Sequence, residues 1–508
     1  MNGLEVSEVL LSEVLIDNEK YRLDSEFFSK NYLSAYEKIK AMVHSNIDKE
    51  MQILTDFHSN GSYEEIAKNF KLLDSKDYAY MVRTTDLENN NFTDNVKYIS
   101  REAYEFLSKS KVFGGELLIN KIGSPGVSFL MPRLEMPVSL GMNLFLLRMN
   151  KTNIDEVTLY LFLNSDIGKK IVQRKVNGTI PLTIDKKAIK SLYIPCFSKD
   201  FRMKLNRIVE NSYSIDKISK TKYSQAENLL LCELGLENFN PSNEKVSIKS
   251  LKESFLKTGR LDSEYYQPKY EVMEKKLDKI GVEKLESICS LINYGTVPTS
   301  PYVKNNNSVP YIKGMNLKNC FIVGELDEIE NTDNLQDKFF TKENDIIISQ
   351  MGTVGDVGIV TKEQENYLFA SFTIRARLDA DRFNPFFVGA YIQNVAKEYY
   401  LYRNIAQASV RQNTDLPTIK NMPIPMVKKE VQDEIAGYIK QSMEYSKKAK
   451  ELLEISTKAV EIAIDKDEQA AHNFLDIQTY RHTDIQTDRQ TDRQTDRQTD
   501  RQTDSRIL

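Results

Sequence analysis

Two clusters of basic and amide side chains are the residues of this sequence best suited to binding a polyanion. The first cluster contains Lys169, Lys170, Arg174, Lys175, Asn177, Lys186, Lys187 and Lys190, and the second contains Arg403, Arg411, Gln412 and Asn413. Lysine and arginine pair with phosphates, and arginine, asparagine and glutamine also form paired hydrogen bonds with base edges. A charge run is as often a solvated surface. The clusters therefore allow, but do not by themselves establish, contact with a nucleic acid.

Two glycine turns of the form G-x-x-G, Gly123–Gly126 and Gly352–Gly355, each follow an apolar segment that reads as a strand. Glycine lets a backbone turn approach a phosphate closely, and it also serves tight turns that need a positive φ. The duplication of the turn does not separate these two interpretations. The candidate DNA contacts within these clusters and at or beside the turns are Lys121, Ser124, Arg174, Lys175, Asn177, Gln350, Thr353, Arg403, Arg411, Gln412 and Asn413, and two further candidates are Arg83 and Lys313.

The sequence carries none of the motifs that would indicate catalysis. It has no G-x-x-x-x-G-K-[ST] phosphate loop and no G-x-G-x-x-G dinucleotide fingerprint. The segment Asn384-Pro385-Phe386-Phe387 resembles the N-P-P-[YF] loop of amino-methyltransferases but lacks the second proline. We expect a helix start there, with Asn384 as the cap and Pro385 at the first helical position. No catalytic residue is predicted.

Metal and disulfide frameworks are also not indicated. The four cysteines, Cys196, Cys232, Cys289 and Cys320, form no C-x-x-C pair, and two of the four histidines lie in a low-complexity tail. The segment Met1–Leu15 has no basic region typical of a secretory signal, and no apolar run approaches the roughly 20 residues that span a bilayer. A protein of the cytoplasm, with no metal and no membrane partner, is expected.

A net charge of −4 over 508 residues is unusual for a nucleic-acid binder, because neutralising phosphates supplies much of the affinity. Any DNA surface on this chain must therefore be local, or a partner must complete it. The length also predicts three to four domains with sizeable cores.

The elements that would position these side chains occur twice. The segment R-L-D-S-E-F-F at 22–28 returns as R-L-D-S-E-Y-Y at 260–266, and the strand with its glycine turn at 115–126 returns at 344–355. Ile189–Pro195 returns as Ile419–Pro425, whereas 63–94 and 294–327 differ greatly. The sequence therefore predicts an internal repeat, in which the two copies share a scaffold and differ in the segments between its landmarks.

After each Ile-Pro element, apolar and small residues recur at alternating spacings of four and three, which is the seam of a coiled coil. The seam positions are Phe201, Leu205, Ile208, Ser212, Ile215, Ser219, Lys222, Ala226 and Leu229 in the first copy, and Val431, Ile435, Tyr438, Ser442, Tyr445, Ala449, Leu452, Ser456 and Ala459 in the second. Helices this long need a partner to be stable, so we expect the two to pack antiparallel against each other. Two unrelated surface helices are the alternative.

The predicted fold class is α+β, with strands at 117–120, 143–148, 345–349 and 372–378 and an amphipathic helix over Glu156–Val176. Two mixed α/β recognition domains with a pseudo-two-fold repeat are joined by the two helices. The predicted boundaries are 1–200 and 241–430 for the domains, 201–240 for the first helix and linker, 431–466 for the second helix, and 467–508 for a disordered tail.

These landmarks occur twice in the same order. In this respect residues 1–466 resemble the specificity subunit of type I restriction-modification enzymes. The resemblance is carried by the two R-L-D-S-E segments, the second continuing as Gln267–Tyr270, by the glycine turns, and by the Ile-Pro elements before paired helices. It implies a non-catalytic protein in which each variable domain reads one half of a split target in double-stranded DNA. The helices would set the gap and dock modification subunits.

The same resemblance implies that this chain holds no cofactor. Methylation with S-adenosylmethionine would belong to the modification subunits, and ATP- and Mg-dependent translocation and cleavage to restriction subunits. Two other functions stay open: the recognition portion of a fused restriction-methylation enzyme, and a coiled-coil scaffold that binds no DNA.

The tail repeats T-D-R-Q from Thr487 to Asp504 and is too polar and regular to form a core. The codons ACA-GAC-AGA-CAG encode T-D-R-Q and form a tetranucleotide repeat, which gives the same peptide in any frame. We therefore expect a slippage tract that varies the ending after Asp504, a form of phase variation. A peptide repeat kept for weak surface contacts is the alternative.

Overall fold

The computed structural model describes residues 8–15, 18, 21–93, 95–178, 180–239, 241, 246–298, 302–303, 307–331, 336–379, 382–405 and 413–478. Its contacts divide the chain into two compact units, residues 1–213 with 449–508 (unit 1) and residues 214–448 (unit 2). Two long helices, α10 (Lys199–Glu233) and α16 (Lys429–Asp465), each contribute one part to each unit. Helices and sheets are mixed throughout, as the sequence predicted.

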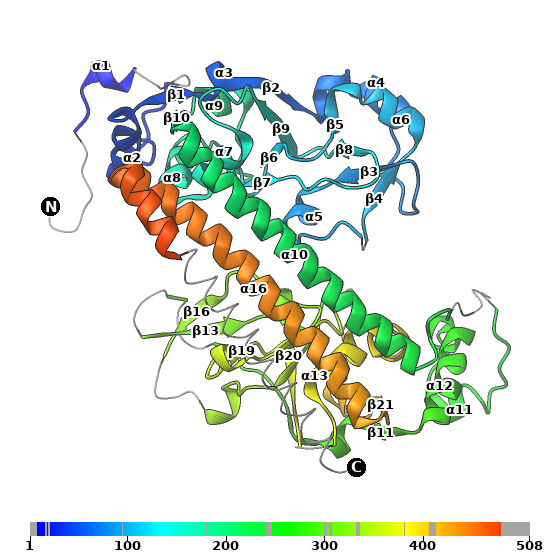
Figure 1. The fold of residues 1–508 in the computed structure, drawn as a ribbon. Helices are drawn as coiled ribbons and strands as arrows, with labels where there is room; N and C mark the ends of the chain where they lie inside the picture. The colour runs from blue at the N-terminus through cyan, green and yellow to red at the C-terminus, as the bar shows by residue number, and fades with distance from the viewer. Residues whose placement is uncertain are drawn as a thin grey trace, which may run out of the picture. The chain divides into compact units, whose positions relative to one another are not determined.

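Unit 1 contains two four-stranded sheets and a two-stranded ribbon (Figure 1). The first sheet has the order β2 (Met51–Asp56), β9 (Leu144–Met149), β6 (Leu117–Asn120), β7 (Ser128–Leu130), and all its pairs are antiparallel. The second has the order β4 (Lys97–Ile99), β3 (Ala79–Val82), β8 (Val138–Leu140), β5 (Lys111–Val112), with β3 and β8 parallel. The ribbon pairs β1 (His44–Asn46) with β10 (Tyr193–Pro195).

The helices of unit 1 cap and cover these sheets. They are α1 (Leu11–Val14), α2 (Lys30–Lys40), α3 (Ile47–Glu50), α4 (Tyr63–Asn69), α5 (Thr84–Glu88), α6 (Arg101–Phe106), α7 (Glu156–Asn164), α8 (Asp166–Arg174) and α9 (Lys186–Ser191). Most begin at a polar side chain that accepts a hydrogen bond from the first turn, as Asp185 does from the Ala188 amide at 2.8 Å.

Unit 2 has a main sheet and a short ribbon that correspond to those of unit 1, but its second sheet has three strands, and it contains an additional two-stranded ribbon. Its main sheet has the order β12 (Cys289–Tyr294), β20 (Thr373–Leu378), β17 (Ile346–Ser349), β18 (Val357–Ile359), again antiparallel. Its second sheet has the order β16 (Asp327–Glu330), β13 (Ser308–Ile312), β19 (Leu368–Phe369), with β13 and β19 parallel. β11 (Val282–Lys284) pairs with β21 (Pro423–Pro425), and β14 (Leu317–Lys318) with β15 (Phe321–Ile322).

The helices of unit 2 besides α10 and α16 are α11 (Phe255–Thr258), α12 (Pro268–Ile280), α13 (Pro385–Tyr391), a π-helical segment (Ile392–Leu401), α14 (Tyr402–Asn404) and α15 (Leu416–Lys420). The predicted start of α13 is confirmed. The Asn384 side chain accepts a hydrogen bond from the Phe386 amide at 3.0 Å, and Pro385 occupies the first turn.

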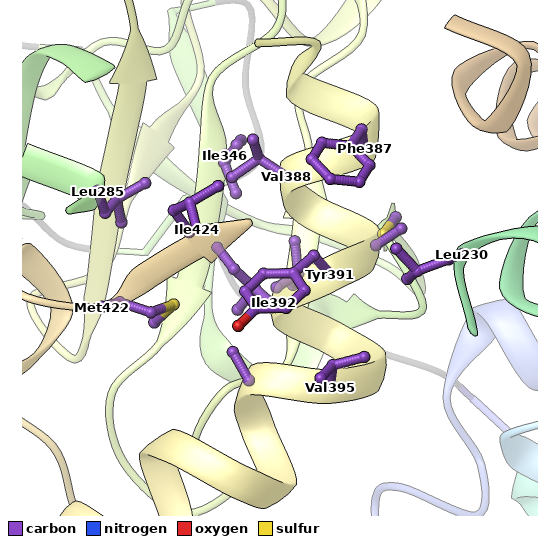
Figure 2. Close-up of a cluster of buried hydrophobic side chains, with 14 of the residues drawn as sticks. Leu230, Leu285, Ile346, Phe387, Val388, Tyr391, Ile392, Val395, Met422 and Ile424 are labelled. Carbon is purple, nitrogen blue, oxygen red and sulfur yellow. The ribbon is translucent and has the colours of Figure 1, made fainter. Parts of the chain in front are cut away.

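The core of unit 2 forms where α13 and the π-helical segment meet the main sheet. Figure 2 shows Phe387, Val388, Tyr391, Ile392 and Val395 along one helical segment, facing side chains from neighbouring strands and Leu230 of α10. All are buried. Burying each such side chain contributes about 1.5–3 kcal/mol relative to leaving it exposed, so this cluster holds the helices on the sheet.

Each unit also contains a packed stretch of the two long helices. In unit 1 the Ser212 hydroxyl donates to the Ala449 carbonyl at 2.8 Å. In unit 2 the Ser219 hydroxyl donates to the Ser442 carbonyl at 2.7 Å, and the Ser442 hydroxyl donates back to the Ser219 carbonyl at 2.8 Å. Lys222 lies over the Tyr438 ring at 5.2 Å. Along these contacts the residue numbers of α16 fall as those of α10 rise. The stretches are therefore antiparallel.

Two elements differ from the prediction. The helix expected over Glu156–Val176 is broken at Ser165, whose amide ends α7 and whose hydroxyl caps α8 by accepting from the Gly168 amide at 3.1 Å. A Cβ on Gly168 would lie 1.9 Å from the Phe162 carbonyl oxygen, so the bend needs glycine there. Periodicity continues across such a capped bend and does not reveal it.

The second difference concerns the tail that was predicted to begin at 467. Residues 468–478 are helical, with the Asp467 side chain accepting from the Ala470 amide at 2.7 Å and with Ala471 and Leu475 buried. His472 contacts the Phe201 ring at 5.3 Å, so this histidine belongs to unit 1. The T-D-R-Q repeats lie outside the described residues, and their predicted disorder and variable ending stay predictions.

None of the helices in the described residues is both long and apolar enough to cross a membrane. Over the same residues, no three His, Cys, Asp or Glu side chains gather in a way that could hold a metal ion.

Candidate nucleic-acid interface

The two glycine turns follow β6 and β17 and have the same geometry. All four glycines have a positive φ, between 80° and 90°. A Cβ on Gly126 would lie 2.0 Å from Val172 Cγ1, and one on Gly355 would lie 2.8 Å from Leu401 Cδ1. The second glycine of each turn therefore packs the turn against a helix, which a larger residue would prevent.

The first glycine of each turn, Gly123 or Gly352, has open space where a Cβ would stand. The residues after them, Ser124 and Thr353, are exposed at the tips of the turns. Conformation alone explains the glycines, while the tips remain accessible to a ligand. Ser124 and Thr353 thus stay candidates for DNA contact.

Lys121 lies at the entrance to the first turn and belongs to an ion network. Its Nζ is 2.9 Å from Asp56 Oδ2, and Lys186 Nζ is 2.7 Å from Asp56 Oδ1 and 2.8 Å from the Ser59 hydroxyl. Burial alone would raise the pKa of Asp56, but hydrogen bonds from Lys121, Lys186 and Ser59 hold that pKa far below its ordinary value. The Asp56 carboxylate is therefore ionised at neutral pH.

The described residues at the corresponding positions of unit 2 carry no charge. Tyr294 ends β12 as Asp56 ends β2, and its hydroxyl accepts a hydrogen bond from the Leu416 amide at 2.9 Å. Gln350 stands where Lys121 stands, half-buried, and its carbonyl accepts from the Thr414 amide at 3.0 Å. Both units thus link the first strand of the main sheet to the helix before the Ile-Pro strand, but with different chemistry.

Arg83 and Lys313 occupy matching positions directly after β3 and β13, and both are paired with carboxylates. Arg83 Nη2 is 2.6 Å from Asp86 Oδ1, and Lys313 forms an ion pair with Asp327. These partners raise the pKa of both basic groups. Each cation is partly exposed and would have to exchange its carboxylate for a phosphate in order to contact DNA.

Arg174 and Arg403 have a structural place that the charge pattern did not reveal. Arg174 is buried, its Nε donates to the Phe27 carbonyl at 3.1 Å, and its guanidinium lies 4.2 Å from the Phe27 ring centroid. Arg403 Nε donates to the Tyr265 carbonyl at 3.1 Å and lies 4.5 Å from the Tyr265 ring centroid. Lys175 is buried beside Arg174. The prediction that Arg174 and Lys175 contact DNA is thus at odds with their burial.

The repeated R-L-D-S-E segments supply the other half of these clamps. Arg22 pairs with Asp24 through two contacts of 2.7 Å and donates to the Val176 carbonyl at 2.7 Å. Arg260 pairs with Asp262 at 2.8 and 2.6 Å and donates to the Ile405 carbonyl at 3.2 Å. In both copies the arginine lowers the pKa of its aspartate. The motif therefore ties the start of each copy to the end of a helix.

The remaining candidates lie on the segment that follows this helix. Asn177 pairs with Thr183 through two backbone hydrogen bonds of 2.8 Å, and its side chain donates to the Lys175 carbonyl at 2.9 Å. Asn413 forms a bridge with Met351. Arg411 and Gln412 lie outside the described residues. The structure thus brings Lys121 and Asn177 to one region of unit 1, and Gln350 and Asn413 to one region of unit 2.

The predicted helix-seam residues all lie on α10 or α16. Leu205, Ile208, Ile215, Ala226, Ile435, Ala449 and Leu452 are buried, and Leu229, Tyr438 and Tyr445 are half-buried. Leu230, which the pattern did not select, is fully buried in place of Leu229.

Sequence reasoning missed Asp56, the acceptor that organises Lys121 and Lys186. The sequence signal for Asp56 is its position at the end of a strand, where the corresponding strand of the second copy ends in Tyr294.

Comparison with known proteins identifies the family of the second half. Residues 278–455 match the family described as "Type I restriction modification DNA specificity domain". This match assigns residues 278–455 to the type I restriction-modification specificity family, and it agrees with the resemblance carried by the repeated motifs. No curated protein matches the chain.

Three solved structures are similar to the chain at low identity. The type I restriction-modification S subunit of M. genitalium has 13% identity and a TM-score of 0.37, covering 84% of this chain and 95% of its own. The HsdS subunit of Thermoanaerobacter tengcongensis has 13% identity and a TM-score of 0.26, covering 84% and 97%. A chain from a structure on assembly and conformational transition of the type I R-M system has 12% identity and a TM-score of 0.26, covering 84% and 98%.

Proposed function

We propose that this chain is the non-catalytic specificity subunit of a type I restriction-modification complex. Unit 1 and unit 2 each read one half of a bipartite DNA target. The helices α10 and α16 set the gap between the halves and dock modification subunits. Methyl transfer with S-adenosylmethionine, and ATP- and Mg-dependent translocation and cleavage, belong to the partner subunits.

One observation carries the extension from the matched domain to the whole chain. The family match reaches unit 1 only at residues 449–455 of α16. The main sheet of unit 1 nevertheless has a strand order that corresponds to that of unit 2, β2-β9-β6-β7 against β12-β20-β17-β18. The arginine clamps at Arg174 and Arg403 also repeat with the same contacts. Two copies of one recognition plan in one chain support a target with two halves.

Divergence within the shared plan supports independent reading by the two units. The main sheets and clamps correspond, whereas Asp56 with Lys121 is replaced by Tyr294 with Gln350. Base choice depends on such side chains, since arginine, lysine, asparagine and glutamine each prefer different base edges.

The proposal is tested by methylation of duplex DNA with purified components. The chain alone should transfer no methyl group, and the chain with its modification subunits should methylate DNA at a split motif. Methyl transfer by the chain alone would identify the fused-enzyme alternative. Failure to bind duplex even with the modification subunits present would identify the scaffold alternative.

A further inference from the structure

Unit 1 contains a cavity of about 820 Å³ beside the first glycine turn. Five cationic side chains line it, Arg22, Lys121, Lys175, Lys186 and Lys187, together with two carboxylates, Asp56 and Asp185. Arg22 is in addition paired with Asp24, so the positive excess rests on the lysines. A whole chain with a net charge of −4 thus concentrates positive charge in one concave place. Such a hollow attracts anions more strongly than the same charges spread over a flat surface.

The contacts inside the cavity leave donors for a ligand. Asp56 neutralises one of its two lysine neighbours, so the Asp56–Lys121–Lys186 network keeps one net positive charge. Lys186 uses two of its three ammonium donors, on Asp56 and Ser59. Lys187 is exposed and has no ion-pair partner in the part of the chain that the structure describes. Lys186 and Lys187 can therefore face an incoming anion together.

The charge of this cavity is not part of the shared scaffold. The positions that match Asp56, Lys121 and Lys186 in unit 2 are Tyr294, Gln350 and Leu416, which carry no charge. The link between strand and helix exists in both units, so the fold does not require lysines there. A feature present in one unit alone is better explained by what that unit binds.

We propose that this cavity binds a nucleotide phosphate, supplied by the backbone of the DNA that unit 1 reads. Lys186 and Lys187 contact the phosphate, whereas the Asp56 carboxylate pairs with Lys121 and Lys186 and competes with the phosphate for Lys186. The assignment to DNA rests on the proposed function, and a free nucleotide is the other source of the same chemistry. Unit 2 has no corresponding phosphate site at the matching positions.

The test measures affinity for a fluorescent duplex against salt, using the full chain with its modification subunits. Lys187→Ala and Lys186→Ala should each weaken binding about five-fold near 0.1 M salt and lower the salt slope by about one, since one phosphate contact is lost. Lys199→Ala is the matched control, because Lys199 is exposed but does not line the cavity. Asp56→Asn should strengthen binding about three-fold, since it adds one positive charge to the wall.

Unchanged affinity and slope in Lys187→Ala, whose exposed side chain is not needed for folding, would overturn the proposal while leaving duplex binding and the proposed function intact. Weaker binding by a folded Asp56→Asn would also overturn it. Absence of duplex binding by the unmodified complex would overturn the proposed function itself. Binding of millimolar AMP that is lost in Lys187→Ala, while the duplex affinity and salt slope of that variant stay unchanged, would overturn DNA as the source and assign the cavity to a free nucleotide.

Discussion

Arg174 shows that residue type and spacing alone do not distinguish a DNA contact from a buried structural contact. Arg174 stands in a run of lysines, and its type and spacing suit DNA as well as they suit a buried clamp. Its partner Phe27 lies 147 positions away, and only the fold brings the two together. For Gly126 and Gly355 the sequence left two interpretations open, and the structure shows a positive φ at both and a helix side chain where a Cβ would stand.

Replacing Arg174 by Ala should destabilise unit 1 by about 2–4 kcal/mol, because the change removes a buried charged donor and its ring contacts. Hydrogen exchange of 22–28 should rise sharply in the full chain, and the salt slope of DNA binding should stay unchanged. Lys169→Ala, an exposed change on the same helix, is the control. Normal protection of 22–28 together with a lower salt slope would instead mark Arg174 as a DNA contact.

The Asp56 network predicts an acid-sensitive contribution to stability. The folded state depresses the pKa of Asp56, so its contribution is fully present above the ordinary value of 3.8 and is lost as pH falls below it. The free energy of unfolding should therefore fall less steeply between about pH 5 and pH 2 in Asp56→Asn than in the unmodified chain. Parallel pH profiles would show that Asp56 is not stabilised by Lys121 and Lys186.

At the scale of elements, strands and long helices followed well from pattern. β6 lies where it was predicted, and β9, β17 and β20 begin one residue later than expected. The helix seam also appears at the predicted residues, because spacings of four and three persist over many turns. The helix predicted over Glu156–Val176 is broken at Ser165. This break depends on the Ser165 cap and on Gly168, which the periodicity of apolar residues does not report.

The two long helices give a prediction about target geometry. One heptad inserted between Ser212 and Ser219, with another between Ser442 and Ala449, keeps the seam in phase and adds roughly 10 Å. At 3.4 Å per base pair, the gap in the methylated motif should grow by about three base pairs. A heptad in α10 alone should lower stability instead, because its seam loses register. An unchanged gap in the double insertion would contradict the spacer role.

At the scale of the whole molecule, the internal repeat could be predicted and the composition of the units could not. Landmark order in the sequence predicted a duplicated plan, and the main sheets of the two units have corresponding strand orders, whereas their second sheets differ in strand number. The predicted domains, 1–200 and 241–430, left the two long helices outside as spacers. In the structure, each compact unit contains part of both α10 and α16. Unit 1 also includes residues 449–478, which are distant in sequence from the rest of the unit. Ala471 and Leu475 of this segment are buried. Local pattern does not report which distant segment covers an apolar face.

The central claim is that the two units read separate halves of one DNA target. The direct measurement is methylome sequencing of cells that express this chain with its modification subunits, before and after residues 63–175 are exchanged for the corresponding part of another specificity subunit. The account predicts a split methylated motif in which the exchange alters one half and leaves the other half and the gap unchanged. A motif without a gap, or an exchange that alters both halves, would contradict it.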